Sequence, residues 1–160
     1  MTLAQLNALP AQAAEAELLR CCGSRRWAGA VAASRPFADR EALIALADHV
    51  WRHVEPADWV EAFRAHPRIG ERSSEAQSQQ EQAGAYQASA DVRVALADGN
   101  RAYEERFDHI FLICATGLSA EQMLASLHAR MRNDAHTELR VAAEEQRKIT
   151  RLRLERMLSP

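Results

Sequence analysis

A histidine followed at once by a proline is the local feature of this sequence best suited to acid–base chemistry. Pro67 disfavours the helical conformation in the residue before it, so a helix opened by Pro56 must end near His66. The dipole at a helix C-terminus favours a protonated imidazole, and imidazole titrates near neutral pH. His66 could therefore donate or accept a proton, although a histidine that only caps its own helix fits this spacing equally well.

Three polar residues recur at helical spacing beyond the histidine. Ser78, Glu81 and Gln82 stand at positions i, i+3 and i+4, so a helix over 75–87 would place them on one face. A carboxylate near an imidazole makes an acid–base pair, and the hydroxyl and amide could hold a small ring rich in carbonyl and N–H groups. The alternative is a solvated polar face, which local spacing alone favours.

The remaining groups capable of chemistry give weaker signals. His49 and His53 have the i, i+4 spacing of a metal-binding pair, but Val50 stands where a zinc-protease helix carries glutamate, so no metal site is predicted. A metal-dependent hydrolase built on this pair remains a third interpretation. The cysteines form no metal or disulfide framework and are interpreted as reduced thiols of a cytoplasmic protein: Cys21, Cys22 and Cys114.

Helix signals along the chain determine how these residues are positioned. Strand signals are nearly absent, and one apolar run, 110–115, could be extended. The predicted starts are marked by helix-capping or helix-opening residues: Pro10, Ser24, Asp39, Pro56 and Ser119 with Gln122. A long terminal helix follows from residue 137. The sequence predicts an all-α fold, with a single compact multi-helix domain over 1–160 and a long C-terminal helix.

Length and charge exclude several classes of protein. The chain has 160 residues and a formal net charge of −2, so it has no strongly basic field for nucleic acid. The first residues do not show the basic-then-apolar pattern of a leader, and no apolar run is long enough to cross a bilayer, so we expect no membrane partner.

The histidine and the polar trio, in this order and separated by a short loop, resemble the 2-oxo-4-hydroxy-4-carboxy-5-ureidoimidazoline (OHCU) decarboxylase family. The likeness covers roughly 18–158, most of the chain. Segments that resemble the bacterial branch of that family recur along it: Cys21-Cys22-Gly23-Ser24 with Trp27, Arg35-Pro36-Phe37, 58–63 before His66-Pro67, Ala102-Tyr103, Phe107, 110–117 and 149–154.

The resemblance implies an all-helical enzyme, usually a homodimer, that converts OHCU to (S)-allantoin in urate breakdown without metal or organic cofactor. It implies that His66 is the catalytic histidine and Glu81 its acidic partner. Substrate-binding roles are implied for seven residues, the last four forming the wall of the pocket: Pro67, Ser78, Gln82, Ile110, Phe111, Leu112 and Ile113.

One departure from the family pattern concerns the residue that would bind the substrate's polar edge. Some members place an arginine soon after the apolar run, whereas here Thr116-Gly117 follows it, so Arg106 or Arg68 would have to substitute. The competing interpretation is a helical interaction module without catalysis, in which the polar helix over 75–87 binds a protein partner and His66 only caps.

Overall fold

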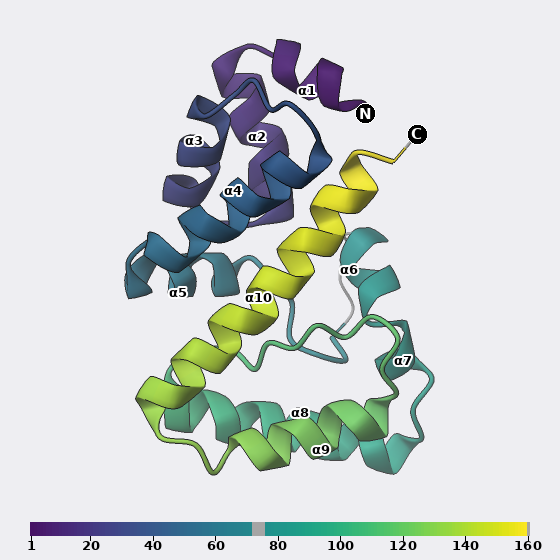
Figure 1. The fold of residues 1–160 in the computed structure, drawn as a ribbon. Coiled ribbons are helices and arrows are strands. Elements are labelled where there is room, and N and C mark those ends of the chain that lie inside the picture. The colour runs from purple at the N-terminus through teal and green to yellow at the C-terminus, as the bar shows by residue number, and fades with distance from the viewer. Residues whose placement is uncertain (72–75, 160) are drawn as a thin grey trace. The chain divides into compact units, whose positions relative to one another are not determined.

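The computed structural model describes residues 1–71 and 76–159 of the chain (Figure 1). Every regular element within these residues is a helix, and the last of them, α10 (Ala135–Met157), is the longest, so the predicted all-α fold with a long C-terminal helix is confirmed. Contacts divide the chain into an N-terminal unit, Met1–Ala65 with Gln146–Pro160, and a central unit, His66–Glu145. The single domain over 1–160 stays a prediction.

In the N-terminal unit the helices after the first start at the predicted signals, whereas the first, capped by Thr2, was not predicted. Ser24 Oγ accepts a hydrogen bond from the Trp27 N–H (3.3 Å), and Asp39 Oδ1 accepts one from the Ala42 N–H (2.7 Å). The helices are α1 (Leu3–Ala8), α2 (Ala11–Cys21), α3 (Arg25–Ala33), α4 (Arg40–His53), α5 (Pro56–Arg64) and the part of α10 from Gln146 onward.

Side-chain bonds to backbone carbonyls join the helices of this unit. The buried Trp27 donates its indole N–H to the Ala47 carbonyl (3.0 Å), which connects α3 with α4. Arg35 donates to the carbonyls of Leu6 and Leu9 (2.7 Å each) and so satisfies acceptors at the end of α1. None of the predicted site residues belongs to this unit.

The central unit contains α6 (Ala76–Glu81), α7 (Ala83–Tyr86), α8 (Ala90–Phe107), α9 (Ala120–Arg130) and the first part of α10. The prediction of one continuous helix over 75–87 is wrong, because the helix is interrupted at Gln82 (φ −102°, ψ 17°). Glu75 lies outside the described residues. The capping box predicted at Ser119 and Gln122 is confirmed at the start of α9.

Helices α8 and α9 pack side by side and run in the same direction. Gly99 of α8 faces Leu127 of α9. Near the C-terminal end of α8, Arg106 donates to the carbonyl of Asn133, just beyond the C-terminal end of α9 (2.9 Å), so the contacts advance in the same direction along both helices. Two parallel helices need a connection that returns along their length, and an extended chain covers about 3.4 Å per residue against 1.5 Å in a helix. This requirement explains why the apolar run 110–115 is neither helix nor strand.

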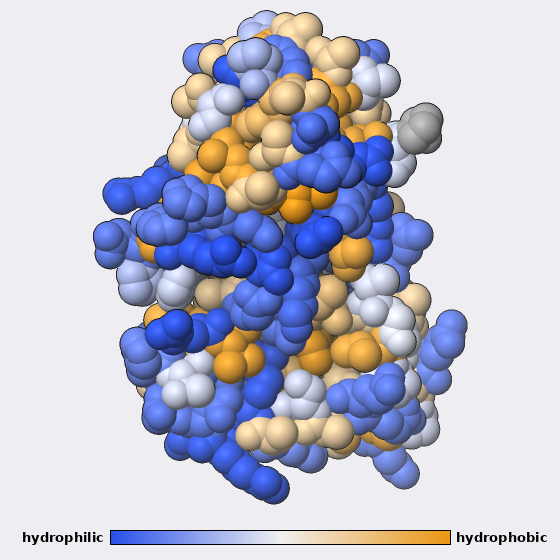
Figure 2. All heavy atoms as spheres, viewed as in Figure 1, coloured by the Kyte–Doolittle hydropathy of each residue, from blue (hydrophilic) through white to orange (hydrophobic). Residues whose placement is uncertain are grey.

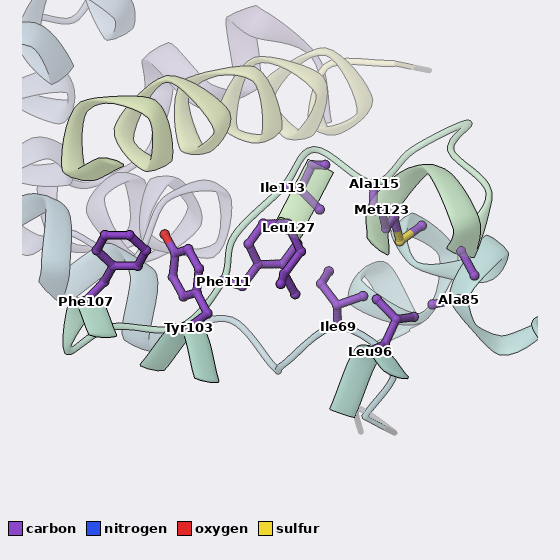
Figure 3. Packing of buried hydrophobic residues seen from close by; sticks show 11 residues of the cluster. Ile69, Ala85, Leu96, Tyr103, Phe107, Phe111, Ile113, Ala115, Met123 and Leu127 are labelled. Atoms are coloured by element: carbon purple, nitrogen blue, oxygen red, sulfur yellow. The ribbon is translucent and has the colours of Figure 1, made fainter. Parts of the chain in front are cut away.

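The core of the central unit lies between α8, α9 and this returning segment (Figure 3). Tyr103 forms ring contacts with Phe107 (4.7 Å between centroids) and Phe111 (5.3 Å). The buried members of the core are Ile69, Ala85, Leu96, Tyr103, Phe107, Phe111, Ile113, Ala115, Ala120, Met123 and Leu127. The predicted substrate-binding segment is therefore part of a packed core.

The exposed surface gives little sign of a large apolar interface. Figure 2 shows a mainly hydrophilic outward face over α10, where Glu144, Lys148 and Arg151 are exposed. Met1 and Val94 are the exposed large hydrophobic residues of the described part of the chain. No helix in that part is both long enough and apolar enough to span a bilayer.

Gly84 in α7 provides a test of how the central unit is packed. A Cβ atom at this position would overlap the carbonyl oxygen of Leu118, which is backbone and cannot move aside easily. We expect Gly84→Ala to lower the free energy of unfolding by about 1–3 kcal/mol, the usual cost of overpacking. Equilibrium urea unfolding measures the change.

The matched control is Gly29→Ala in the interior of α3. The nearest atoms to a Cβ there belong to the Glu15 side chain at 3.9 Å, so alanine fits and should stabilise the helix by about 0.5–1 kcal/mol. If Gly84→Ala were as stable as the wild type, α7 could not pack against Leu118 as described.

Candidate functional site

The loop that begins at His66 is held by two side chains from other elements of the central unit. Asn100 of α8 donates its amide N–H to the Ile69 carbonyl (3.0 Å), and Gln82 Oε1 accepts from the Gly70 N–H (3.1 Å). Gly70 has a φ of +87°, a conformation that favours glycine. Because both bonds come from packed elements, the backbone that follows the half-buried His66 has a defined course.

Ser78, Glu81 and Gln82 are all buried. Their exposed fractions are 2%, 9% and 6%, whereas the neighbouring Gln79 and Gln80 are exposed. The alternative of a solvated polar face is therefore wrong for these three residues. Burying a hydroxyl, a carboxylate and an amide costs free energy unless each is paired, so their burial needs a structural or chemical reason.

The side chains of Gln82 and Ser78 differ in what they contact. The carbonyl oxygen of the Gln82 amide is occupied by the Gly70 N–H, which links the α6–α7 junction to the loop after His66. The Ser78 hydroxyl has no hydrogen-bond partner within the described part of the chain. A buried hydroxyl without a partner is rare in folded proteins and is a candidate for binding a ligand.

The segment Ile110 to Ile113 supplies a row of backbone groups next to the core. Phe111, Leu112 and Ile113 are buried, yet their N–H groups donate no hydrogen bond to any residue that the structure describes. The next residue differs, because the Cys114 N–H donates to Glu145 Oε2 (3.2 Å). Backbone N–H groups in buried segments are nearly always paired, so three consecutive donors without an acceptor among the described residues suggest a binding surface.

The two arginines that could hold the substrate's polar edge already have partners. Arg68 forms a two-point contact with Glu104 (2.5 and 3.1 Å), and this carboxylate raises the pKa of Arg68 above its ordinary value. The pair is partly exposed and contributes little to stability. Arg106 donates to the Asn133 carbonyl and lies over the Phe107 ring (5.0 Å).

A buried ion pair, absent from the sequence-based predictions, lies behind the 110–113 segment. Arg130 Nε donates to Glu138 Oε1 (2.7 Å), and Arg130 Nη1 donates to the Leu112 carbonyl (2.7 Å). Arg130 Nη2 lies 2.6 Å from Glu138 Oε1 without hydrogen-bond geometry. Tyr103 donates its hydroxyl to the same oxygen (2.5 Å), and burial, together with this bond, raises the pKa of Tyr103.

A sequence signal for this ion pair exists, although it is faint. Arg130 stands three residues after Leu127, on the apolar stripe of α9, and Glu138 stands four residues before Ala142 on the stripe of α10. A charged residue that falls on a buried stripe must be paired, because an isolated buried charge is very costly. The spacing cannot say which charge pairs with which.

A cavity of about 400 Å³ opens beside the loop, and its described lining includes Arg68 but none of the predicted catalytic or substrate-binding residues. Its described lining comes from the loop and from one face of α8: Arg68, Ile69, Gly70, Glu71, Arg93, Leu96, Ala97, Asn100, Arg101 and Glu104. Most of the charges there already pair with one another, Arg68 with Glu104 and Glu71 among them.

The residues considered as metal ligands do not form a metal centre within the described chain. His53 Nδ1 lies 2.7 Å from the His49 carbonyl, and the two rings are tilted by 35° with their centroids 4.3 Å apart. No group of three or more histidine, cysteine, aspartate or glutamate side chains converges in the part that the structure describes. The interpretation as a metal-dependent hydrolase therefore gains no support.

Comparison with known proteins identifies relatives for most of the chain. The sequence profile of OHCU decarboxylase matches residues 7–155. A bifunctional uric acid degradation protein of Arabidopsis thaliana is 38% identical over 147 residues, which cover 87% of this chain and 45% of that protein. The OHCU decarboxylases of Amia calva and Mus musculus are 32% and 31% identical, covering 80% and 82% of this chain and 77% and 78% of theirs.

Solved structures agree with these sequence relatives. A crystal structure of an OHCU decarboxylase in the presence of (S)-allantoin superposes with a TM-score of 0.82 at 36% identity and covers 90% of this chain and 98% of that one. An (S)-allantoin synthase structure has a TM-score of 0.78 at 18% identity, which shows a shared fold. The chain thus spans less than half of the Arabidopsis relative but nearly all of one solved relative.

Proposed function

Because the chain belongs to the OHCU decarboxylase family, we propose that it converts OHCU to (S)-allantoin in urate breakdown. The observation that carries this proposal is the family match over residues 7–155, which includes every residue of the candidate site. Further support comes from the central unit, where Ser78, Gln82 and Phe111 to Ile113 are buried and the Ser78 hydroxyl has no hydrogen-bond partner among the described residues.

The proposed reaction uses the substrate ring as its own electron sink. The bond between C4 and its carboxylate breaks, carbon dioxide leaves, and the bonding electrons form a C4=C5 double bond while the C5=N electrons move to nitrogen, which takes a proton. The C4 hydroxyl then loses its proton, and C5 gains one from a single face. The protein has to orient the carboxylate, stabilise the electron-rich intermediate and direct that last proton.

In this proposal His66, assisted by Glu81, moves the proton at the C4 hydroxyl or at C5. An imidazole suits this role because it exchanges a proton near neutral pH. Pro67 borders the site, and Ser78 and Gln82 hold the carbonyl oxygens. The Ser78 hydroxyl, which has no partner among the described residues, supports its part of the proposal, while the Gln82 amide oxygen already accepts from the Gly70 N–H.

The backbone of Ile110 to Ile113 completes the proposed binding surface. Each N–H group that meets a substrate oxygen in a buried site is worth about 1–3 kcal/mol, and three such groups stand in sequence here. The interaction-module alternative, in which the polar helix over 75–87 binds a protein partner, is disfavoured because three of its polar residues, Ser78, Glu81 and Gln82, are buried.

Other parts of the proposal rest on the resemblance alone. They are the homodimer, the place in the bacterial branch and the independence of metal and organic cofactor. The cytoplasmic location rests on the interpretation of the cysteines as reduced thiols.

A coupled assay tests the proposed reaction. Urate oxidase and hydroxyisourate hydrolase generate OHCU from urate, and circular dichroism follows the chirality of the allantoin formed with and without this protein. We expect rapid appearance of (S)-allantoin. Formation of racemic allantoin at the spontaneous rate, with folded protein present, would contradict the proposal.

A further inference from the structure

We infer that Arg130 is a positioning residue, which through the Leu112 carbonyl fixes the direction of the Ile113 N–H. The inference rests on the proposed function, in which the 110–113 segment faces the substrate. It concerns a side chain that lies behind this segment and reaches the substrate only through the backbone.

The guanidinium of Arg130 is held in one orientation by a buried carboxylate. Glu138 has no exposed surface, and its Oε1 accepts hydrogen bonds from Arg130 Nε (2.7 Å) and from the Tyr103 hydroxyl (2.5 Å). Its Oε2 accepts from Asn133 Nδ2 (3.0 Å). With both oxygens of the carboxylate bonded, neither the carboxylate nor the planar guanidinium can rotate freely.

The same guanidinium contacts the segment at two points. Nη1 donates to the Leu112 carbonyl (2.7 Å), and Cζ lies 4.6 Å from the centre of the Phe111 ring. One contact holds the backbone and the other holds the adjacent side chain. Arg130 therefore fixes both the rotation and the position of this part of the segment.

Peptide geometry transmits this constraint to the next residue. The peptide bond between Leu112 and Ile113 is trans, so the Leu112 C=O and the Ile113 N–H point in opposite directions. When Arg130 holds the carbonyl on one side, the Ile113 N–H must point to the other. That N–H has no acceptor among the described residues and is free to meet a substrate oxygen.

The need to orient the Leu112 carbonyl offers a reason for a buried ion pair at this place. A buried ion pair stabilises a protein little more than apolar residues of similar volume would, because desolvation offsets the attraction. An apolar pair could fill the space but could not hold a carbonyl. Fixed N–H donors stabilise charge that develops during a reaction without having to reorganise.

The test compares Arg130→Lys with Tyr103→Phe. Lysine retains the charge beside Glu138 but lacks the planar fork that also reaches Leu112. Tyr103→Phe removes a bond to the same Glu138 oxygen and leaves the bond from Arg130 to Leu112 in place. The measurements are kcat and KM, the enantiomeric excess of allantoin, and the amide resonance of Ile113 in two-dimensional NMR spectra.

We expect Arg130→Lys to lower kcat/KM by about 10- to 100-fold, mainly through kcat, since a displacement near 1 Å can have this effect. The enantiomeric excess should fall and the Ile113 amide resonance should shift or broaden. Tyr103→Phe should keep the wild-type enantiomeric excess and Ile113 resonance. If Arg130→Lys keeps the wild-type kcat, enantiomeric excess and Ile113 resonance, the inference is wrong.

A second variant covers the possibility that Arg130→Lys does not fold. The double variant Arg130→Met with Glu138→Leu removes both charges together and should remain folded. We expect it to lose enantiomeric excess, whereas full retention would overturn the inference. If the wild type forms no (S)-allantoin, the proposed function fails, while the Ile113 resonance in these variants still tests the positioning role.

Discussion

Replacing His66 with asparagine is expected to lower kcat by about a hundredfold to ten-thousandfold and to abolish the excess of (S)-allantoin. Asparagine is close to histidine in size and can form hydrogen bonds, but it cannot exchange a proton near pH 7. A positioned acid or base contributes typically this much to a reaction. The measurement is the coupled assay with circular dichroism, in which the remaining allantoin should be racemic.

The matched control for His66→Asn is His128→Asn on the exposed surface of α9. This change also removes an imidazole from the central unit, and it should leave rate and stereochemistry unchanged. Both variants should show the far-UV spectrum of the wild type, since His66 lies outside the helices. Wild-type stereospecific activity in His66→Asn would show that His66 is not the acid–base group.

The largest expected effect on stability follows from replacing Glu138 with alanine. The change leaves the Arg130 guanidinium buried without its counter-charge, and it also removes the acceptor of the Tyr103 hydroxyl. Breaking a buried ion pair by removing one partner typically costs about 3–5 kcal/mol. Equilibrium urea unfolding at pH 7 should show a loss of this size.

Two further variants identify the cause of that loss. Glu105→Ala removes an exposed carboxylate from α8 and should change the free energy of unfolding by less than about 0.5 kcal/mol. The double variant Arg130→Met with Glu138→Leu should recover most of the stability, because no charge is left buried. A loss below about 1 kcal/mol in Glu138→Ala would mean that Arg130 finds water or another partner.

Local signals were sufficient to predict most helix boundaries. Asp39 and Ser119 cap α4 and α9 as predicted, and Pro56 is the first residue of α5. Capping depends on residues three or four positions apart, so the sequence contains the whole interaction. The end of α5 before His66 follows in the same way from Pro67.

Where local signals failed to predict the structure, contacts between residues far apart in the sequence determined it. The predicted helix over 75–87 is interrupted at Gln82, whose side chain bonds to Gly70, and Gly84 lies against Leu118. Neither contact can be read from spacing, because the partners are many residues apart. The burial of Ser78 has the same origin. Helical spacing predicted that Ser78 shares a helix face with Glu81 and Gln82, but only tertiary packing determines that this face is buried.

The sequence by itself determined the all-α class, the positions of most helices and, through the residues around His66 and Glu81, the family. These properties depend on local backbone preferences and on residue identity. Only the tertiary structure decided that the N–H groups of 111–113 have no acceptor among the described residues and that Arg130 holds the Leu112 carbonyl. The physical reason is that α8 and α9 run parallel, so the returning segment is extended and packs against them, and its hydrogen bonds depend on side chains from elsewhere in the chain.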